Sequence, residues 1–408
     1  MSLLTQLVNL FFSQRRGEID FFMQHPARVQ QQQLERLLTQ AGGTVFGRDH
    51  GFGKIRTSEA YAAAVPVADY DSFSEYIGRT RTGEQNVLWP TEIKWFAKSS
   101  GTTSAKSKFI PVSDEGLSGC HLRGPMDVIC FFAGLYPKSG VFGGRTLTLG
   151  GSHRLESTGG RAQEGDLSAI LIENTPKWAS WRRTPRPETA LIPDFEEKVQ
   201  AICREAVPQR VTSFAGVPSW NLVLMNRVLE YTGKQNILEV WPEMELFVHG
   251  GMNFNPYREQ YRRIFPSDTM KYMETYNASE GFFAIQDDPS RDDMLLMLDY
   301  GVYYEFLPVS DLGDPSKAVP LEGVKQGVNY AMIISTSNGL WRYQIGDTVE
   351  FTSLAPYKIK ITGRTKHFIN AFGEELIIDN AETALQAACA ATGALVSDYT
   401  AGPIYMGD

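Results

Sequence analysis

The sequence feature that most constrains the fold is an alternation of strand-like and helix-like segments in the middle of the chain. Apolar runs typical of strands occupy residues 210–214, 246–248 and 270–275, and amphipathic helical patterns occupy 194–205, 219–231 and 255–264. This alternation, with turns at the strand ends, predicts an α/β unit. A further strand is expected over 168–172, and Trp220, Leu224 and Val228 are expected on one helix face.

The patterns on either side of this unit differ from it. Residues 1–41 predict one or two amphipathic helices, 70–77 a short helix capped by Asp69 or Asp71, and 116–135 two helices broken at Gly124-Pro125. Segments 294–306, 328–336, 340–351 and 357–362 have strand composition and short connecting turns. They predict an antiparallel, barrel-like sheet that packs on the α/β unit. A hinge is expected near residue 363, and a helix over 379–391.

Charge and composition exclude several classes of function. The 408 residues carry a formal net charge of −8, which argues against a general nucleic-acid binder. The four cysteines (Cys120, Cys130, Cys203 and Cys389) and the six scattered histidines have no metal-ligand spacing. The apolar N-terminal stretch lacks the layout of a secretory signal, and no apolar run is long enough to span a membrane. We expect a monomeric cytoplasmic enzyme with reduced thiols.

A hydroxyl-rich loop is the first candidate site. Between the apolar runs 93–97 and 109–112, which predict two strands, lie Ser99, Ser100, Gly101, Thr102 and Thr103, followed by the lysines at 106 and 108. Hydroxyls, a glycine that allows close backbone approach and nearby ammonium groups together suit phosphate oxygens. The spacing is not that of a Walker P-loop, and a plain solvated hairpin has the same composition.

Two carboxylates and a basic turn are the other candidates. Glu280 follows a predicted strand in Tyr276-Asn277-Ala278-Ser279-Glu280-Gly281, where it could hold Mg²⁺ against a phosphate. Asp347 ends Trp341-Arg342-Tyr343-Gln344-Ile345-Gly346-Asp347, where it could accept the hydroxyls of a ribose. Arg364 and Lys366 follow and suit ribose or phosphate oxygens. Ordinary turns would explain each of these segments equally well when taken alone.

Other segments receive a structural interpretation. The basic loop 178–187 with Arg182, Arg183 and Arg186 is interpreted as a solvated surface. The acids between 287 and 293 are interpreted as a surface turn, because the spacing of an EF-hand is missing. The apolar segments 122–132 and 217–224 are interpreted as core, with the wall of an acyl pocket as the alternative.

Taken in order, these motifs resemble those of a known family. Ser-Ser-Gly-Thr-Thr at 99–103 with Lys108, Ala-Ser-Glu-Gly-Phe-Phe at 278–283 and Trp-Arg-Tyr-Gln-Ile-Gly-Asp at 341–347 are similar to motifs of the plant auxin-responsive Gretchen Hagen 3 acyl acid amido synthetases and their bacterial relatives. That family belongs to the adenylate-forming superfamily of acyl-CoA synthetases and firefly luciferase. The likeness runs over nearly the whole chain, although Ala105 stands where the plant loop commonly has glycine.

The resemblance implies a fold, a reaction and roles for the motif residues. It implies a large multi-subdomain N-terminal adenylate-forming domain over 1–366 and the start of a small C-terminal lid over 367–408, where other members continue further. It implies that a carboxylic acid reacts with ATP and Mg²⁺ and that an amino acid amine then takes the acyl group. Acid–CoA ligation and binding without turnover are the alternatives. The implied roles are phosphate binding by Ser99, Ser100, Gly101, Thr102, Thr103 and Lys108, nucleotide contact by Tyr276, Asn277, Ala278, Ser279, Arg364 and Lys366, ribose binding by Asp347, metal binding by Glu280, and catalysis by Glu280 and Lys366.

Overall fold

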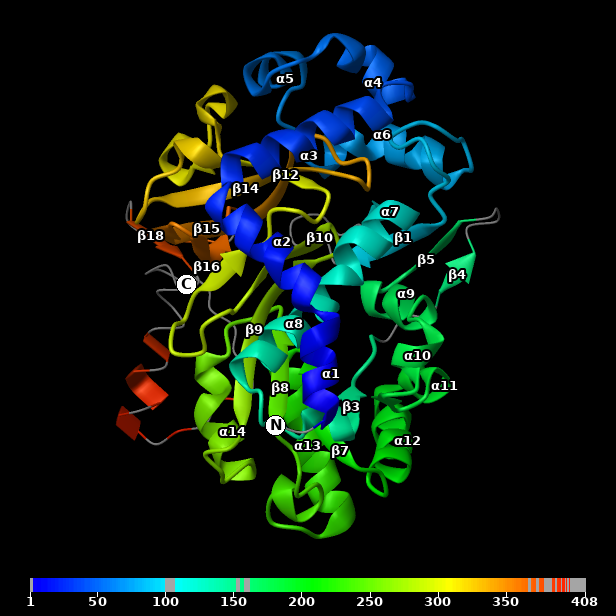
Figure 1. Ribbon diagram of the computed structural model, residues 1–408, viewed down its shortest axis with the longest axis vertical. Coiled ribbons are helices and arrows are strands. Elements are labelled where there is room, and N and C mark those ends of the chain that lie inside the picture. Colours follow the sequence, from blue (N-terminus) through cyan, green and yellow to red (C-terminus); the bar gives the residue numbers. More distant parts are fainter. Residues whose placement is uncertain are drawn as a thin grey trace, which may run out of the picture.

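A long β-sheet forms the centre of the molecule in a computed structural model (Figure 1). The structure describes residues 3–99, 107–151, 155–157, 162–365, 368–371 and 374–377, and scattered positions between 384 and 396. Among these residues the sheet has twelve strands in the order β13-β12-β14-β15-β16-β11-β10-β9-β8-β7-β3-β6. The strands are β3 (Arg145–Thr148), β6 (Arg183–Thr184), β7 (Val211–Gly216), β8 (Leu246–Gly250), β9 (Lys271–Ala278), β10 (Gly281–Ile285), β11 (Met294–Leu296), β12 (Val302–Pro308), β13 (Val319–Pro320), β14 (Asn329–Thr336), β15 (Tyr343–Leu354) and β16 (Tyr357–Arg364).

The two halves of this sheet differ in strand direction. From β6 to β9 the neighbouring strands are parallel, which confirms the α/β unit predicted from the alternation of patterns. From β9 onward the neighbours are antiparallel, as the second half of the sequence predicted. The antiparallel half does not form a separate sheet, because β9 pairs with β8 along one edge and with β10 along the other. The hairpin of β9 and β10 therefore joins the two halves.

Helices cover both faces of the parallel half. On one face α12 (Phe195–Ala206), α13 (Pro218–Thr232) and α14 (Arg258–Ile264) pack on Phe214 and Phe247. On the other face lie α1 (Leu3–Phe11) and α8 (Arg123–Leu135), as Figure 1 shows. Leu224 and Val228 lie on the buried face of α13. Trp220 is 53% exposed and does not share this face, contrary to the prediction. Trp220 instead packs edge-on against Phe195 at the surface.

The N-terminal segment forms more helices than predicted. Its elements are α1, α2 (Ser13–Gln24), α3 (Pro26–Ala41), α4 (Val45–Asp49), η1 (Phe52–Lys54), α5 (Ser58–Ala64) and α6 (Tyr70–Arg81). Pro26 occupies the first position of α3, where its missing N–H costs nothing, and so separates α3 from α2. The predicted cap of α6 is confirmed, because the Asp69 carboxylate accepts a hydrogen bond from the Ser72 N–H at 3.2 Å.

Two predictions about helices and strands near the middle of the chain were also wrong. Residues 168–172 lie in α9 (Leu167–Glu173) and not in a strand, because an apolar run of five residues fits either periodicity and packing decides. The chain does not break at Gly124-Pro125, because Pro125 falls in the first turn of α8, where no backbone donor is needed. The irregularity comes earlier, as the π-helical turn η2 (Leu117–His121).

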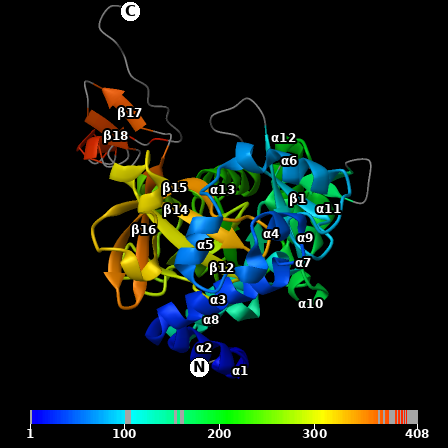
Figure 2. The ribbon, with the colours of Figure 1, turned by 90° about the horizontal axis from the view of Figure 1, so that it is seen from above.

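The remaining elements are short. A second sheet contains β1 (Trp95–Ser99), β2 (Lys108–Val112), β4 (Glu156–Ser157) and β5 (Gln163–Gly165), and a third pairs β17 (Phe368–Ala371) with β18 (Glu374–Ile377). Figure 2 shows β17 and β18 beside the antiparallel half. The other helical segments are α7 (Asp114–Gly116), η3 (Val141–Gly143), α10 (Lys177–Ser180), α11 (Pro187–Ala190), η4 (Ile237–Glu239), η5 (Asn255–Tyr257), η6 (Val309–Asp311), η7 (Pro315–Lys317) and η8 (Leu321–Gly323).

Three expectations about the chain as a whole can be compared with this fold. Cys120, Cys130 and Cys203 are buried free thiols, as predicted. Within the described ranges, no helix combines the length and the apolar character that crossing a membrane requires. The helix predicted over 379–391 is helical at 384–385, 387–389 and 391–392, and its other residues lie outside the described part of the chain.

Candidate nucleotide-binding site

The hairpin of β9 and β10 presents Glu280 at the carboxyl end of the parallel strands. Ala278 pairs with Gly281, so that Ser279 and Glu280 are the two turn residues. Ligands of open α/β sheets bind at this end of the strands. The Glu280 side chain does not point into solvent, because the residue is only 6% exposed. A buried carboxylate at the end of a strand is therefore the first component of the site.

Cys120 holds this hairpin from the side of η2. Its Sγ accepts a hydrogen bond from the Phe282 N–H at 3.1 Å and lies 3.6 Å from the Phe282 carbonyl oxygen. Burial raises the pKa of the Cys120 thiol to about 12, so the sulfur keeps its proton at neutral pH. The thiol thus contacts the backbone N–H and carbonyl groups that a neighbouring strand would otherwise pair with at the start of β10. A single cysteine in an apolar segment carries no sequence signal for this role.

A bulge in β15 sets the position of Asp347. Gln344 pairs with Ile333 and Thr348 with Ala331, so residues 345–347 face a single residue of β14. Gly346 lies within the bulge with φ of 96°, a left-handed conformation that glycine adopts at little cost. Bulges of this kind redirect side chains at functional sites. The glycine before Asp347 in the motif therefore has a conformational role.

Both oxygens of Asp347 have partners within the protein. The Arg364 Nε donates to Oδ1 at 2.9 Å from the facing position on β16. The Tyr276 hydroxyl donates to Oδ2 at 2.8 Å from β9. Each carboxylate oxygen has a second lone pair, so Asp347 can still accept two hydrogen bonds from a ligand. The carboxylate is fixed in orientation before any ligand binds.

The hydroxyl-rich loop lies between β1 and β2, as predicted. These strands are antiparallel, and Ser99 at the end of β1 faces Lys108 at the start of β2. The Tyr70 hydroxyl accepts a hydrogen bond from the Phe109 N–H at 2.9 Å, and the Lys108 Nζ lies 5.8 Å from the centre of the Tyr70 ring. Ser100, Gly101, Thr102, Thr103 and, further along the chain, Lys366 lie outside the described residues.

Electrostatic interactions connect these parts of the chain. The pKa of Glu280 is raised to about 7, first by burial and then by the negative charge of Asp347, while Lys108 and Arg364 lower it. Four charged residues from separate segments thus interact electrostatically, namely Lys108 of β2, Glu280 of the turn after β9, Asp347 of β15 and Arg364 of β16. Asn277, Ala278 and Ser279 lie beside Glu280 at the end of β9 and in the turn. The individual ligand contacts of all these residues remain predictions.

Glu280 should reduce the stability of the fold at neutral pH. Its pKa is about 7 in the folded protein and 4.5 ordinarily, so between these values the folded state binds more protons than the unfolded state. Stability is lost as pH rises through this window, by up to about 3 kcal/mol. We expect Glu280→Gln to be more stable than the wild type by about 3 kcal/mol at about pH 8 and nearly equal at about pH 4.5. Urea unfolding without nucleotide or Mg²⁺ measures this, and a difference independent of pH would contradict it.

Sequence reasoning assigned no role to Arg342, which anchors the start of β15. Its Nε and Nη2 each lie 2.9 Å from the Glu305 carboxylate, and both side chains are 5% exposed. Its Nη1 donates to the carbonyl oxygens of Ala62 and Val65 at 2.8 Å. The φ of Arg342 is 43°, so β15 begins only at Tyr343 and not at 340 as predicted. The motif pattern gave no sign of this pairing, because Glu305 lies in a separate strand.

Removal of this arginine should strongly destabilise the protein. We expect Arg342→Met to cost about 3–5 kcal/mol of unfolding free energy, because Glu305 would be left buried without a counter-charge. The double variant Arg342→Met with Glu305→Leu removes both charges and should recover much of the loss. Denaturant unfolding of both variants measures the effect. Equal stability of the single and double variants would show that the ion pair does not anchor β15.

The residues present fit a divalent cation and a nucleotide. Glu280 is a buried carboxylate whose raised pKa indicates that its negative charge is poorly compensated, and oxygen ligands suit Mg²⁺. The described residues contain no cluster of three or more His, Cys, Asp or Glu side chains that could hold a metal. A magnesium ion that shares its ligands between one carboxylate, phosphate oxygens and water matches this donor set.

Known proteins resemble this chain in sequence and in fold. The GH3 family N-terminal domain matches residues 15–197 and 161–270, and the GH3 family central domain matches 295–364. A jasmonoyl–L-amino acid synthetase of Nicotiana attenuata, JAR4, is 24% identical over 400 residues, which cover 82% of this chain and 68% of that protein. The structure of the GH3.15 acyl acid amido synthetase superposes with a TM-score of 0.75 at 17% identity, covering 91% of this chain and 75% of the other.

A more distant structure places the fold in a wider class. A 2-hydroxyisobutyryl-CoA ligase, with its acyl adenylate bound, superposes with a TM-score of 0.58 at 12% identity, covering 88% of this chain and 72% of that one. The chain therefore shares the fold of these two ligases. The chain belongs to the GH3 family, whose domain models match more than half of its residues.

Proposed function

We propose that this chain is an ATP-dependent acyl acid amido synthetase. It joins a small carboxylic acid to the amine of an amino acid through an acyl adenylate. Its membership of the GH3 family and its similarity to amido synthetases support this reaction. The single observation that carries the proposal is the electrostatic interaction of the buried Glu280 carboxylate, at the end of β9, with Lys108 and with the ion pair of Asp347 and Arg364.

In the first half-reaction, a carboxylate oxygen of the acid attacks the α-phosphorus of ATP. A new P–O bond forms, the bond to the β-phosphate oxygen breaks, and pyrophosphate leaves with its electron pair. Two anions must approach each other, so fixed cations at this point lower the barrier. Asp347 orients the ribose, and Lys108 and Arg364 place positive charge near the phosphates. Glu280 would hold Mg²⁺, which supplies charge neutralisation at the phosphates when it is bound.

In the second half-reaction, the amine nitrogen attacks the carbonyl carbon of the acyl adenylate. An amide bond forms, the C–O bond to AMP breaks, and the nitrogen loses a proton to water or a nearby base. The same cations that favour adenylation stabilise the departing AMP.

Product analysis tests this function. The full chain is incubated with ATP, Mg²⁺ and a panel of aliphatic and aromatic acids, with either a mixture of amino acids or coenzyme A as acceptor. We expect acid-dependent release of pyrophosphate and AMP, and an amide detected by mass spectrometry. A thioester in place of the amide would assign the chain to acid–CoA ligation. Binding of ATP without any acid-dependent pyrophosphate would contradict the synthetase function.

A further inference from the structure

The hydroxyl of Tyr343, at the start of the motif strand β15, has no hydrogen-bond partner in the described part of the chain. The residue is 0% exposed, so water does not replace the missing partner. A buried polar atom without a partner costs free energy, and native proteins contain few of them. A hydroxyl that is retained in this state therefore calls for a functional explanation.

The other tyrosines that are equally buried all have a partner. Each of these hydroxyls lies within hydrogen-bond distance of a side-chain or carbonyl oxygen: Tyr61 with Ser335 at 2.7 Å, Tyr261 with the Pro218 carbonyl at 2.7 Å, Tyr300 with Asp127 at 2.6 Å and Tyr304 with the Met297 carbonyl at 3.0 Å. Tyr343 is thus the exception among the tyrosines of the described ranges that are 0% exposed.

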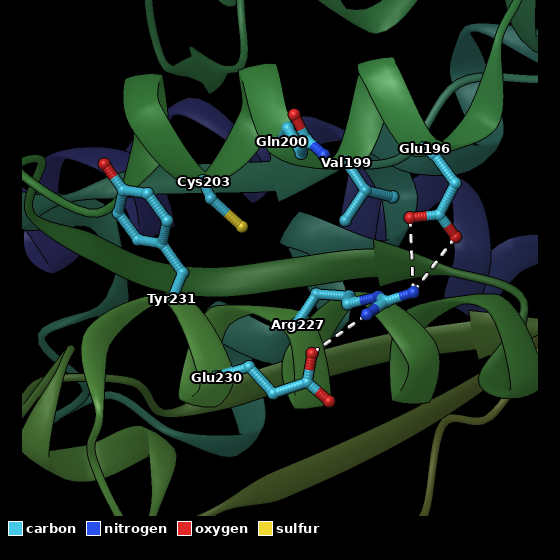
Figure 3. Close-up of a pocket in the computed structure, with 7 residues that line it drawn as sticks. All are labelled: Glu196, Val199, Gln200, Cys203, Arg227, Glu230 and Tyr231. Atoms are coloured by element: carbon cyan, nitrogen blue, oxygen red, sulfur yellow. Dashed lines mark hydrogen bonds and ion pairs between the residues drawn. The ribbon is translucent and has the colours of Figure 1, made fainter.

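Arginines of the described chain also have partners for their polar groups. Figure 3 shows Arg227 beside a cavity of about 280 Å³ between α12 and α13, where it lies 3.1 Å from Glu196 and 3.0 Å from Glu230. Arg183, interpreted from sequence as part of a solvated surface, is only partly exposed, so that interpretation is wrong for this residue. It donates to two threonine hydroxyls, at 2.9 and 3.2 Å. The unpaired hydroxyl of Tyr343 is therefore unusual for this protein.

Packing on both sides fixes the position of Tyr343. Its backbone pairs with Ile334 of β14 on one side and forms a bridge to Ala68 on the other, where the Gln344 N–H donates to the Ala68 carbonyl oxygen at 2.8 Å. Its ring stands edge-on to Phe73 of α6, with the ring centres 5.9 Å apart. The hydroxyl therefore cannot turn out to solvent, and any partner has to come to it.

Glu280 is the charged group that acts most strongly on this hydroxyl. The pKa of Tyr343 is raised first by burial and then by the negative charge of Glu280. Asn338, which follows β14, donates to the Glu280 carbonyl oxygen at 3.4 Å, so the end of β14 lies against the turn that carries Glu280. The Glu280 carboxylate accepts a hydrogen bond from its own backbone N–H and has further lone pairs.

Asp69 is the other carboxylate that raises the pKa of Tyr343. It already accepts two hydrogen bonds from Ser72, at 3.2 and 3.0 Å, as the cap of α6. Glu280 has no such structural role, and it is the carboxylate with the larger effect on Tyr343. The acceptor that suits the unpaired hydroxyl best is therefore Glu280.

We propose that Tyr343 is a positioning residue for the metal, because its hydroxyl donates a hydrogen bond to the Glu280 carboxylate when Mg²⁺ and ATP are bound. The inference rests on the proposed function, in which Glu280 holds Mg²⁺. A carboxylate that ligates a metal is commonly oriented by a hydrogen bond from a neighbouring side chain. One Glu280 oxygen then ligates the metal while the other accepts from Tyr343. Only the Glu280 side chain has to turn, since Tyr343 is fixed by its packing.

Calorimetry of ATP binding to the full chain, without acid or amino acid, tests this role. The dissociation constant is measured once with excess Mg²⁺ and once with EDTA, and the ratio of the two values gives the contribution of the metal. We expect Tyr343→Phe to reduce this ratio about 10-fold and to leave the Kd in EDTA unchanged. Glu280→Gln should reduce the ratio as well. Adding Tyr343→Phe to Glu280→Gln should cause no further loss, because the tyrosine acts through the carboxylate.

Tyr61→Phe is the matched control, because it removes an equally buried hydroxyl that has a partner, Ser335. It should lower the unfolding temperature and leave the ratio unchanged. Tyr343→Phe removes a hydroxyl without a partner, so without ligands it should unfold at the wild-type temperature or above. Thermal unfolding without ATP or Mg²⁺ measures this difference between the two variants.

The outcomes separate this inference from the proposed function. A ratio that falls in Glu280→Gln and not in Tyr343→Phe would overturn the inference and leave the synthetase intact. A loss from Tyr343→Phe that persists in the Glu280→Gln background would also overturn it, because Tyr343 would then contact the nucleotide directly. A ratio that depends on both residues, in a protein that never releases pyrophosphate with any acid, would support the inference and count against the synthetase.

Discussion

Replacement of Glu280 by glutamine should lower kcat by about 100- to 1,000-fold, because the charge that the carboxylate and its magnesium ion provide at the phosphates is lost. Glutamine has nearly the same size and keeps one oxygen, so the hairpin should retain its shape. Higher Mg²⁺ should restore little of the activity, since a neutral amide is a much poorer ligand than a carboxylate. Steady-state pyrophosphate release at several Mg²⁺ concentrations measures the effect.

The same variant should be more stable than the wild type at neutral pH, which separates loss of chemistry from loss of folding. A protein that becomes more stable and less active has lost a group retained for function. Glu322→Gln, an exposed residue of η8, is the matched control and should leave kcat unchanged. If Glu280→Gln kept wild-type activity, Glu280 would be a buried structural acid and not a metal ligand.

Replacement of Asp347 by alanine should lower kcat/KM for ATP by about 100- to 1,000-fold, which corresponds to two hydrogen bonds from ribose hydroxyls to a charged acceptor. Arg364 would also lose its partner, since its Nε donates to Asp347 Oδ1 at 2.9 Å. The effect should fall mainly on the KM for ATP and leave the preference among acids unchanged. Initial rates over a range of ATP concentrations measure this division.

Glu350→Ala provides the control for Asp347→Ala. Glu350 lies three residues further along β15, is partly exposed and faces Asn329 on β14. Its removal should not change kcat/KM for ATP. If Asp347→Ala changed the relative rates with different acids and not the KM for ATP, Asp347 would belong to the acyl site.

The local order of this fold could be predicted from the sequence where a segment has one dominant periodicity. The helix α12 and the strands β7 and β8 were predicted to within a few residues, because long amphipathic patterns and β-branched runs leave little choice. A short apolar run fits a helix as well as a strand, and α9 was accordingly predicted as a strand. Arg342 has a left-handed backbone conformation, so β15 begins after it, and no periodicity in the sequence could indicate this.

The candidate site followed from the sequence only through the family resemblance. Tyr276 and Asp347 are 71 residues apart and share a hydrogen bond, which no local pattern can predict. The pairing of Asp347 with Arg364 could have been expected from a β-hairpin over 343–364, since its two strands place them opposite each other. The contacts of Cys120, Arg342 and Arg183 depend on elements distant in the chain, so only the fold shows them.

Acid-dependent exchange of labelled pyrophosphate into ATP tests the central claim most directly, because it reports adenylation alone and needs no acceptor. With the full chain, Mg²⁺, the best acid of the panel and ATP well below the wild-type KM, we expect exchange that requires the acid and is reduced at least 100-fold in both Glu280→Gln and Asp347→Ala. Exchange that proceeds at the wild-type rate in these two variants, or that never depends on an acid, would contradict the account of a single ATP bound between Glu280 and Asp347.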